Sequence, residues 1–192
     1  MGLDGRPLRS QRKKSWNARK SGTPGDVSLL RLSRPASLNR YVQLIDLPTK
    51  NEVFMSDECW ITGWGASHVD PKRTFPDVLN EAQMTVLNNP DCARRFSSLG
   101  HIYDSHICVF SEEAVACYGD SGGPLSCRNP DGTWVVAGVT SWGSSLCKEM
   151  PAVYTRVSTY VDWIYEHMKT PYDTPETTGT SSLDEVKQSE RT

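Results

Sequence analysis

The stretch Cys117-Tyr-Gly-Asp-Ser-Gly-Gly-Pro-Leu125 places one serine among closely spaced glycines. Glycines allow backbone conformations that other residues rarely adopt, and a backbone turned in this way aims neighbouring N–H groups at one point. A hydroxyl beside such an anion cradle suits acyl transfer, in which the hydroxyl attacks a carbonyl and the N–H groups stabilise the oxyanion. An ordinary glycine-rich turn with an incidental serine is the alternative, and the nine-residue string makes it the weaker one. We therefore expect Ser121 to be a nucleophile, with the N–H groups of Gly119 and Ser121 as oxyanion donors.

The sequence around this stretch resembles the chymotrypsin/trypsin-like serine protease family. The resemblance runs in family order from about Lys14 to Met168, which is most of the chain. It is carried by the serine stretch together with Asp26-Val-Ser-Leu-Leu-Arg-Leu32, Cys59-Trp-Ile-Thr-Gly-Trp-Gly65, Val139-Thr-Ser-Trp-Gly143, Pro151-Ala-Val-Tyr-Thr-Arg-Val157 and Tyr160-Val-Asp-Trp-Ile164. Such an ordered set is highly specific, and it implies a serine endopeptidase that hydrolyses peptide bonds in protein substrates.

The resemblance also implies roles for single residues. Asp26 would orient and stabilise the catalytic imidazole, and Ser141 would donate a hydrogen bond to its carboxylate. Asp26 on its own would be interpreted as a turn or cap residue, as aspartate often is, and only the surrounding motifs favour the catalytic role. Asp120 would receive the new α-amino terminus that cleavage of the zymogen creates. The residues whose backbone would pair with the substrate are Ser141, Trp142 and Gly143.

The pocket for the substrate side chain is expected to be apolar. Val115 stands six residues before Ser121, where an acidic residue would select arginine or lysine substrates. Valine cannot pair with a cation, and burying an unpaired cation is costly. Gly143 leaves the mouth of the pocket open, and Ala152 narrows its wall. We expect a chymotrypsin- or elastase-like preference, although a shift of one residue would place Ala114 or Ala116 at the base.

The six cysteines indicate three disulfides and an oxidising compartment. Spacing alone leaves 15 pairings open. The resemblance implies the pairs Cys59–Cys127, Cys92–Cys108 and Cys117–Cys147. We expect a secreted, extracellular protein, although residues 1–20 contain no apolar core of a signal peptide.

The chain departs from the family pattern in its first part. The family draws its general base from an Ala-Ala-His-Cys segment, and its activation site reads Arg or Lys followed by Ile-Val-Gly-Gly; this sequence has neither. We expect its four histidines on the surface: His68, His101, His106 and His167. The chain is therefore expected to be inactive on its own. The alternative is a catalytically inactive homologue that serves as a binding or regulatory module.

Short apolar runs separated by turns predict strands at 27–32, 42–47, 59–65, 81–87, 134–142 and 152–157. Turns are predicted at 88–91 and 129–132. A capping pattern at Thr159-x-x-Asp162 and apolar residues at helical spacing predict a helix that ends before Pro171. The predicted fold is all-β, a trypsin-like double barrel whose second barrel is complete and whose first barrel is reduced to one strand. We expect a disordered basic head over 1–13, the protease domain over 14–168 and a disordered tail over 169–192.

The net charge and the apolar stretches of the chain restrict the classes of partner that it can bind. The chain carries 21 basic and 23 acidic residues, a net charge of −2, which disfavours a protein that coats nucleic acid. A minor alternative assigns residues 6–20 to nucleic acid or a nuclear signal on the strength of their basic charge. The longest apolar stretch is too short to span a bilayer, and neither a metal site nor a cofactor is predicted. We expect a monomer whose partners are peptide substrates and protein protease inhibitors.

Overall fold

The computed structural model describes residues 10–15, 23–55, 58–67, 74–96, 100–147 and 149–169. The predicted disorder of residues 1–9 and 170–192 lies outside the described residues. The elements are β1 (Ser10–Ser15), β2 (Ser28–Leu32), β3 (Cys59–Gly63), β4 (Asn80–Leu87), α1 (Asn89–Arg95), β5 (His106–Phe110), β6 (Pro124–Arg128), β7 (Trp134–Gly143), β8 (Ala152–Arg156), η1 (Val157–Thr159) and α2 (Val161–Met168). Residues 10–13, which the sequence assigned to the head, lie in β1.

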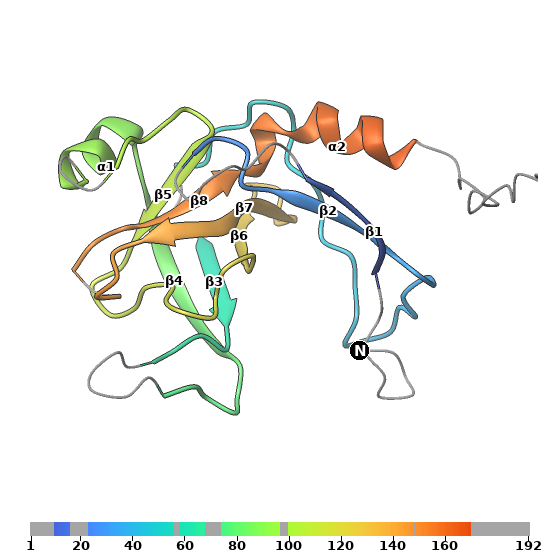
Figure 1. Ribbon diagram of the computed structural model, residues 1–192, viewed down its shortest axis with the longest axis horizontal. Helices are drawn as coiled ribbons and strands as arrows, with labels where there is room; N and C mark the ends of the chain where they lie inside the picture. The colour runs from blue at the N-terminus through green and yellow to red at the C-terminus, as the bar shows by residue number, and fades with distance from the viewer. Residues whose placement is uncertain are drawn as a thin grey trace, which may run out of the picture.

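Six strands close into a barrel in the order β3-β4-β5-β8-β7-β6 (Figure 1). Every neighbouring pair is antiparallel, from the β3–β4 pair to the contact between β3 and β6 that closes the ring. The prediction of an all-β, trypsin-like fold with one complete barrel and a C-terminal helix is confirmed. The barrel matters for function because it holds both ends of the serine stretch: Leu125 lies in β6, and Cys117 is disulfide-bonded to Cys147 in the loop after β7.

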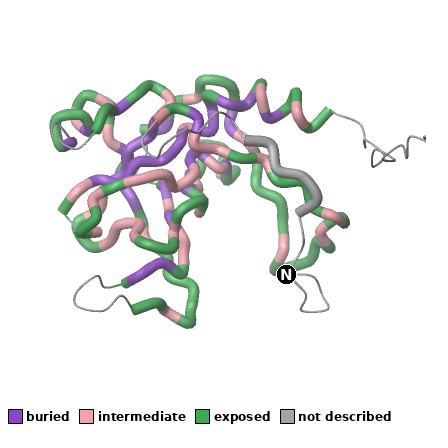
Figure 2. Tube along the Cα trace, in the orientation of Figure 1, coloured by how far each residue is buried: buried purple, intermediate pink, exposed green. Residues whose placement is uncertain are grey.

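Alternate residues of each barrel strand point into one apolar core. In β3, for example, Cys59 and Ile61 are buried and Trp60 is only half-buried. Figure 2 shows the buried segments gathered in the barrel strands. The large side chains of this core include Ile61, Met84, Ile107, Leu125 and Tyr154.

The described residues before β3 contain a second, two-stranded sheet. β2 pairs with β1 in antiparallel register, with Lys14 opposite Leu29. The prediction that the 27–32 strand stands without a partner is therefore wrong. The sheet still covers only part of its apolar surface, because Leu30 is 56% exposed. Leu29, on the opposite face of the strand, packs against the apolar cluster of Val157, Tyr160 and Ile164.

The C-terminal segment holds this sheet against the barrel (Figure 1). Val157, Tyr160 and Ile164 are buried, and they pack against Val27, Leu29 of β2, and Val136 and Val139 of β7. The predicted helix exists, but its N-cap is Tyr160 rather than Thr159, and no side chain caps it. One cluster thus joins the segment that carries Asp26 to the strand that carries Ser141.

The structure differs from the predicted elements in three further places. The 42–47 segment forms only two isolated bridges, one of them between Asp46 and Val135. The 88–91 turn is the start of α1, where the Asn88 side chain accepts from the Asp91 N–H and Pro90 lies in the first turn. Strands β5 and β6 were not predicted, because β5 is a short apolar run without alternation, and β6 alternates over only two buried positions, Leu125 and Cys127.

Candidate active site

Three disulfides fix the loops around the candidate site. They are Cys59–Cys127, Cys92–Cys108 and Cys117–Cys147, the pairings that the resemblance implies. The first joins β3 to β6 inside the barrel. The third joins the start of the serine stretch to the loop that follows β7, so the two segments cannot separate.

The turn around Ser121 has the backbone that its glycines permit. Gly119 and Gly122 have φ values of 102° and 81°, in the region that favours glycine. The N–H groups of Asp120, Gly122 and Gly123 donate to backbone carbonyls. Among the described residues, no acceptor is found for the N–H groups of Gly119 and Ser121. The exposed Ser121 hydroxyl therefore lies beside two backbone donors that remain available to a ligand.

Asp120 ties this turn to the end of β3. Its carboxylate accepts the N–H of Gly65 at 2.8 Å through Oδ1 and the N–H of Cys117 at 2.9 Å through Oδ2. A Cβ on Gly65 would lie 2.3 Å from Oδ2, and one on Gly63 would lie 1.9 Å from Oδ1. Glycine is thus required at both positions for the Asp120 carboxylate to occupy this place.

Asp26 is anchored from two strands of the barrel. Its Oδ2 accepts the Ser141 hydroxyl of β7 at 2.6 Å, and its main-chain oxygen accepts the Thr155 hydroxyl of β8 at 2.7 Å. Both Asp26 and Ser141 are half-buried. The structure therefore brings these two predicted site residues together.

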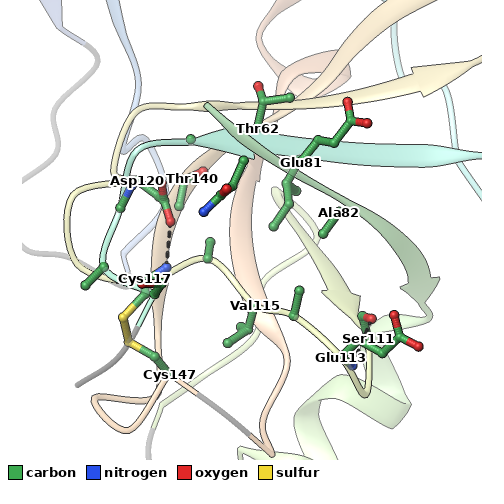
Figure 3. Close-up of a pocket in the computed structure, with 18 of the residues that line it drawn as sticks. Thr62, Glu81, Ala82, Ser111, Glu113, Val115, Cys117, Asp120, Thr140 and Cys147 are labelled. Atoms are coloured by element: carbon green, nitrogen blue, oxygen red, sulfur yellow. Dashed lines mark hydrogen bonds between the residues drawn. A yellow bond between two sulfur atoms is a disulfide. The ribbon is translucent and has the colours of Figure 1, made fainter. Parts of the chain in front are cut away.

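A cavity of about 490 Å³ lies behind the serine turn (Figure 3). Its walls include Val115, flanked by Ala114 and Ala116, together with Asp120 and the Cys117–Cys147 disulfide. Ser141, Trp142, Gly143 and Ala152 are not among its lining residues, so the cavity does not unite the whole predicted substrate set. Its carboxylates are those of Glu81, Glu112, Glu113, Glu149 and Asp120, and no basic side chain of the described residues lines it.

The histidines are not all where the sequence placed them. His106 is 1% exposed, so the expectation that it lies on the surface is wrong. It begins the apolar run His-Ile-Cys-Val-Phe of β5, which was the available signal for burial. His101 is exposed, His167 is partly buried with Nδ1 2.8 Å from the Trp163 carbonyl oxygen, and His68 lies outside the described residues. Within the described part of the chain, no hydrogen bond joins a histidine to Ser121.

Neither a metal site nor a membrane segment was found in the described part of the chain. No group of three or more histidine, cysteine, aspartate or glutamate side chains there is arranged to hold an ion. No helix there is long and apolar enough to cross a membrane.

Comparison with known proteins agrees with this geometry. The trypsin family model matches residues 6–164. Tryptase from Mus musculus is 36% identical over 152 residues, covering 74% of this chain and 55% of tryptase. Chymotrypsin-like elastase family member 3B from Homo sapiens is 37% identical over 155 residues, covering 79% and 57%. Transmembrane protease serine 7 from Mus musculus is 39% identical over 150 residues, covering 74% and 18%. The chain spans little more than half the length of the first two relatives. It belongs to the trypsin family of serine proteases.

Proposed function

We propose that this chain carries the nucleophile and the substrate-binding face of a serine endopeptidase. Ser121 attacks the peptide carbonyl, and the N–H groups of Gly119 and Ser121 stabilise the oxyanion. The observation that carries the proposal is the serine turn itself: an exposed hydroxyl beside two backbone donors, on a loop anchored through Asp120. In the same proposal Asp26 orients the catalytic imidazole while Ser141 holds its carboxylate.

The proposed reaction needs a general base that these residues do not supply. His106 is buried, and the described residues contain no hydrogen bond between a histidine and Ser121. A base must come within hydrogen-bond reach of the hydroxyl, directly or through one water. The chain on its own is therefore proposed to hydrolyse peptides slowly or not at all, and to need a histidine from an Ala-Ala-His-Cys segment of the kind that the family carries.

The substrate preference proposed here is apolar. Val115, between Ala114 and Ala116, faces the cavity and offers no charge to a cationic side chain. Glu112 and Glu113 are exposed, so water screens their charges. Ser141, Trp142 and Gly143 supply the edge of β7 on which the substrate backbone pairs, and Ala152 of β8 lies beside Gly143.

Asp120 has a further proposed role in activation. The half-buried Asp120 carboxylate accepts the N–H groups of Gly65 and Cys117. A cationic α-amino group would find complementary charge there. We place the protein in the extracellular space, because three disulfides persist in an oxidising compartment. Its proposed partners are peptide substrates and protein protease inhibitors, which bind it as a monomer.

A chimera tests the proposal. A first-barrel segment of a trypsin-family protease that carries the Ala-Ala-His-Cys sequence is fused before this chain, and the chimera is treated with a fluorophosphonate probe. We expect one adduct on Ser121 by mass spectrometry, none on the Ser121→Ala chimera, and none on the unfused chain. Peptide substrates with phenylalanine or alanine before the cleaved bond should react faster than those with arginine.

Two results would speak against it. A folded chimera that binds peptides but takes up no probe would favour the inactive binding module instead. A preference for arginine would overturn the apolar pocket and leave the nucleophile in place.

A further inference from the structure

His106 is a buried titratable side chain that the proposed mechanism does not use. It opens β5 beside Ile107, whose side chain enters the barrel core, so strand alternation sends the His106 side chain to the opposite face. Its Nδ1 accepts the N–H of Tyr103 at 3.3 Å. Its Nε2 is buried, and the backbone of Thr23 is the polar group that interacts with the ring. Since Nδ1 is an acceptor, the imidazole is neutral and carries its proton on Nε2.

The His106 ring contacts the substrate-binding strand. Its centroid lies 6.2 Å from the Trp142 ring and 5.3 Å from the Tyr103 ring, both in edge-to-face geometry. Trp142 also packs against Phe96, with centroids 4.9 Å apart. His106 is therefore one of the rings that support Trp142, and a movement of the imidazole removes part of that support.

The same histidine is linked to the segment that carries Asp26. Its cross-strand partner in β8 is Thr155, whose hydroxyl donates to the Asp26 carbonyl at 2.7 Å. The main-chain oxygen of His106 accepts from the Arg156 guanidinium at 2.7 Å. His106 thus lies where three parts of the fold meet: the segment that carries Asp26, strand β7 with Trp142, and the paired strands β5 and β8.

Protonation would break this arrangement. An imidazolium carries a proton on Nδ1, so that atom would oppose the Tyr103 N–H instead of accepting it. Burial lowers the pKa of His106, and the charges of His101 and Arg156 act in the same direction. The backbone of Thr23 and the Asp26 carboxylate act in the opposite direction and favour the cation. Asp104, beside Arg156, is the other charged group at this end of β5 and β8.

We propose that His106, as the neutral imidazole, is a positioning residue that holds Trp142 and the Asp26 segment in place for peptide binding. This inference rests on the proposed function and adds regulation to the same site. Acidification releases Trp142 before the barrel unfolds, and affinity for a peptide strand falls with it.

The test follows the indole N–H of Trp142 by NMR in the full chain, with the resonance assigned from Trp142→Phe. The pH is lowered from about 8 to about 5, the range in which histidine changes charge. We expect the Trp142 signal to shift with the same midpoint as the His106 ring protons. His106→Asn, whose side-chain oxygen can still accept from Tyr103, should abolish the shift. His101→Gln, in the neighbouring exposed histidine, should keep the shift and move its midpoint to higher pH, because one charge that opposes the cation is removed.

Peptide binding is measured alongside, with acetyl-Ala-Ala-Pro-Phe-amide as the probe. We expect its dissociation constant to rise about tenfold on acidification, equivalent to about 1.4 kcal/mol, in the wild type and in His101→Gln. His106→Asn should show no such rise.

Several outcomes decide the matter. A Trp142 signal that stays constant, or one that still shifts in His106→Asn, overturns the inference. Simultaneous loss of all six tryptophan signals also overturns it, because protonation then unfolds the whole domain. If no variant binds the peptide at any pH while the Trp142 signal follows His106, the proposed substrate site fails and the positioning role stands.

Discussion

The hydroxyl of Ser141 donates to the carboxylate of Asp26 across 2.6 Å, joining residues that are 115 positions apart in the chain. Asp26 lies two residues before β2, and Ser141 lies in the barrel strand β7. The bond is half-buried, where a charge-assisted hydrogen bond is short and strong. Together with the Thr155 bond and the apolar cluster of Val157, Tyr160 and Ile164, it links the two parts of the fold where the proposed catalytic aspartate must be held.

Replacing Ser141 by alanine should lower stability measurably. The Asp26 carboxylate would keep its partial burial and lose a hydrogen bond, at a cost of about 1.5–3 kcal/mol for a charged group. Urea unfolding measures the change. Ser145→Ala, at an exposed position four residues further on, is the control and should stay within about 0.5 kcal/mol of the wild type. Equal losses in the two variants would contradict the prediction.

Gly65→Ala should destabilise the serine turn through Asp120. The added Cβ would lie 2.3 Å from the Asp120 carboxylate, and crowding of this kind costs about 1–3 kcal/mol. In Asp120→Ala the clash disappears, so the Gly65→Ala change should cost much less in that background. Thermal or urea unfolding of the two single variants and the double variant gives the coupling energy. Strict additivity would show that the two residues do not meet.

The three disulfides should contribute unequally. Cys92–Cys108 closes 16 residues and Cys59–Cys127 closes 68. The entropy of the unfolded chain then predicts losses of about 3 and about 4 kcal/mol when each pair is replaced by alanine. Denaturant unfolding of the two paired-alanine variants tests the order. A larger loss for the shorter loop would mean that packing around the sulfurs outweighs loop closure.

Stability should fall as the pH drops below about 6.5, the ordinary pKa of histidine. Because the pKa of His106 is lowered in the folded protein, the unfolded chain binds its proton first. The unfolded state then holds more protons, and the free energy of unfolding decreases until the pH passes the folded pKa. Urea unfolding between about pH 7.5 and 5.5, above most carboxyl titration, measures this slope. His106→Asn should flatten it and His101→Gln should not; equal slopes in all three proteins would disprove the assignment.

Local sequence signals predicted the barrel and the serine turn well. Closely spaced glycines around Ser121 predicted the turn, and alternating or strongly β-forming runs predicted β3, β4 and β7. The helix α1 was missed because Asn88 followed by Asn and Pro indicates a turn as readily as an N-cap. The partner of β2 was missed because β1 is a polar run, Ser-Gln-Arg-Lys-Lys-Ser, whose pairing depends on tertiary contacts rather than on apolar periodicity.

The burial of His106 needed the structure for a similar reason. The apolar run of β5 indicated a buried strand, but a single histidine at its first position can point into solvent, and the ring contacts with Trp142 and Tyr103 appear only in the folded chain. Likewise, the sequence placed Val115 and Asp120 in different roles, and only the folded chain shows that both line one cavity.

All three cross-links lie between residues 59 and 147, so the covalent reinforcement stops short of the β1–β2 sheet. That sheet is fastened by the Asp26 bonds and by the apolar contacts of Val27 and Leu29 with the C-terminal helix. Heat or a protease should therefore open the β1–β2 sheet before the barrel. Disulfides still connect parts of the barrel after its non-covalent contacts are lost, whereas the segment that carries Asp26 detaches once its hydrogen bonds and apolar contacts are broken.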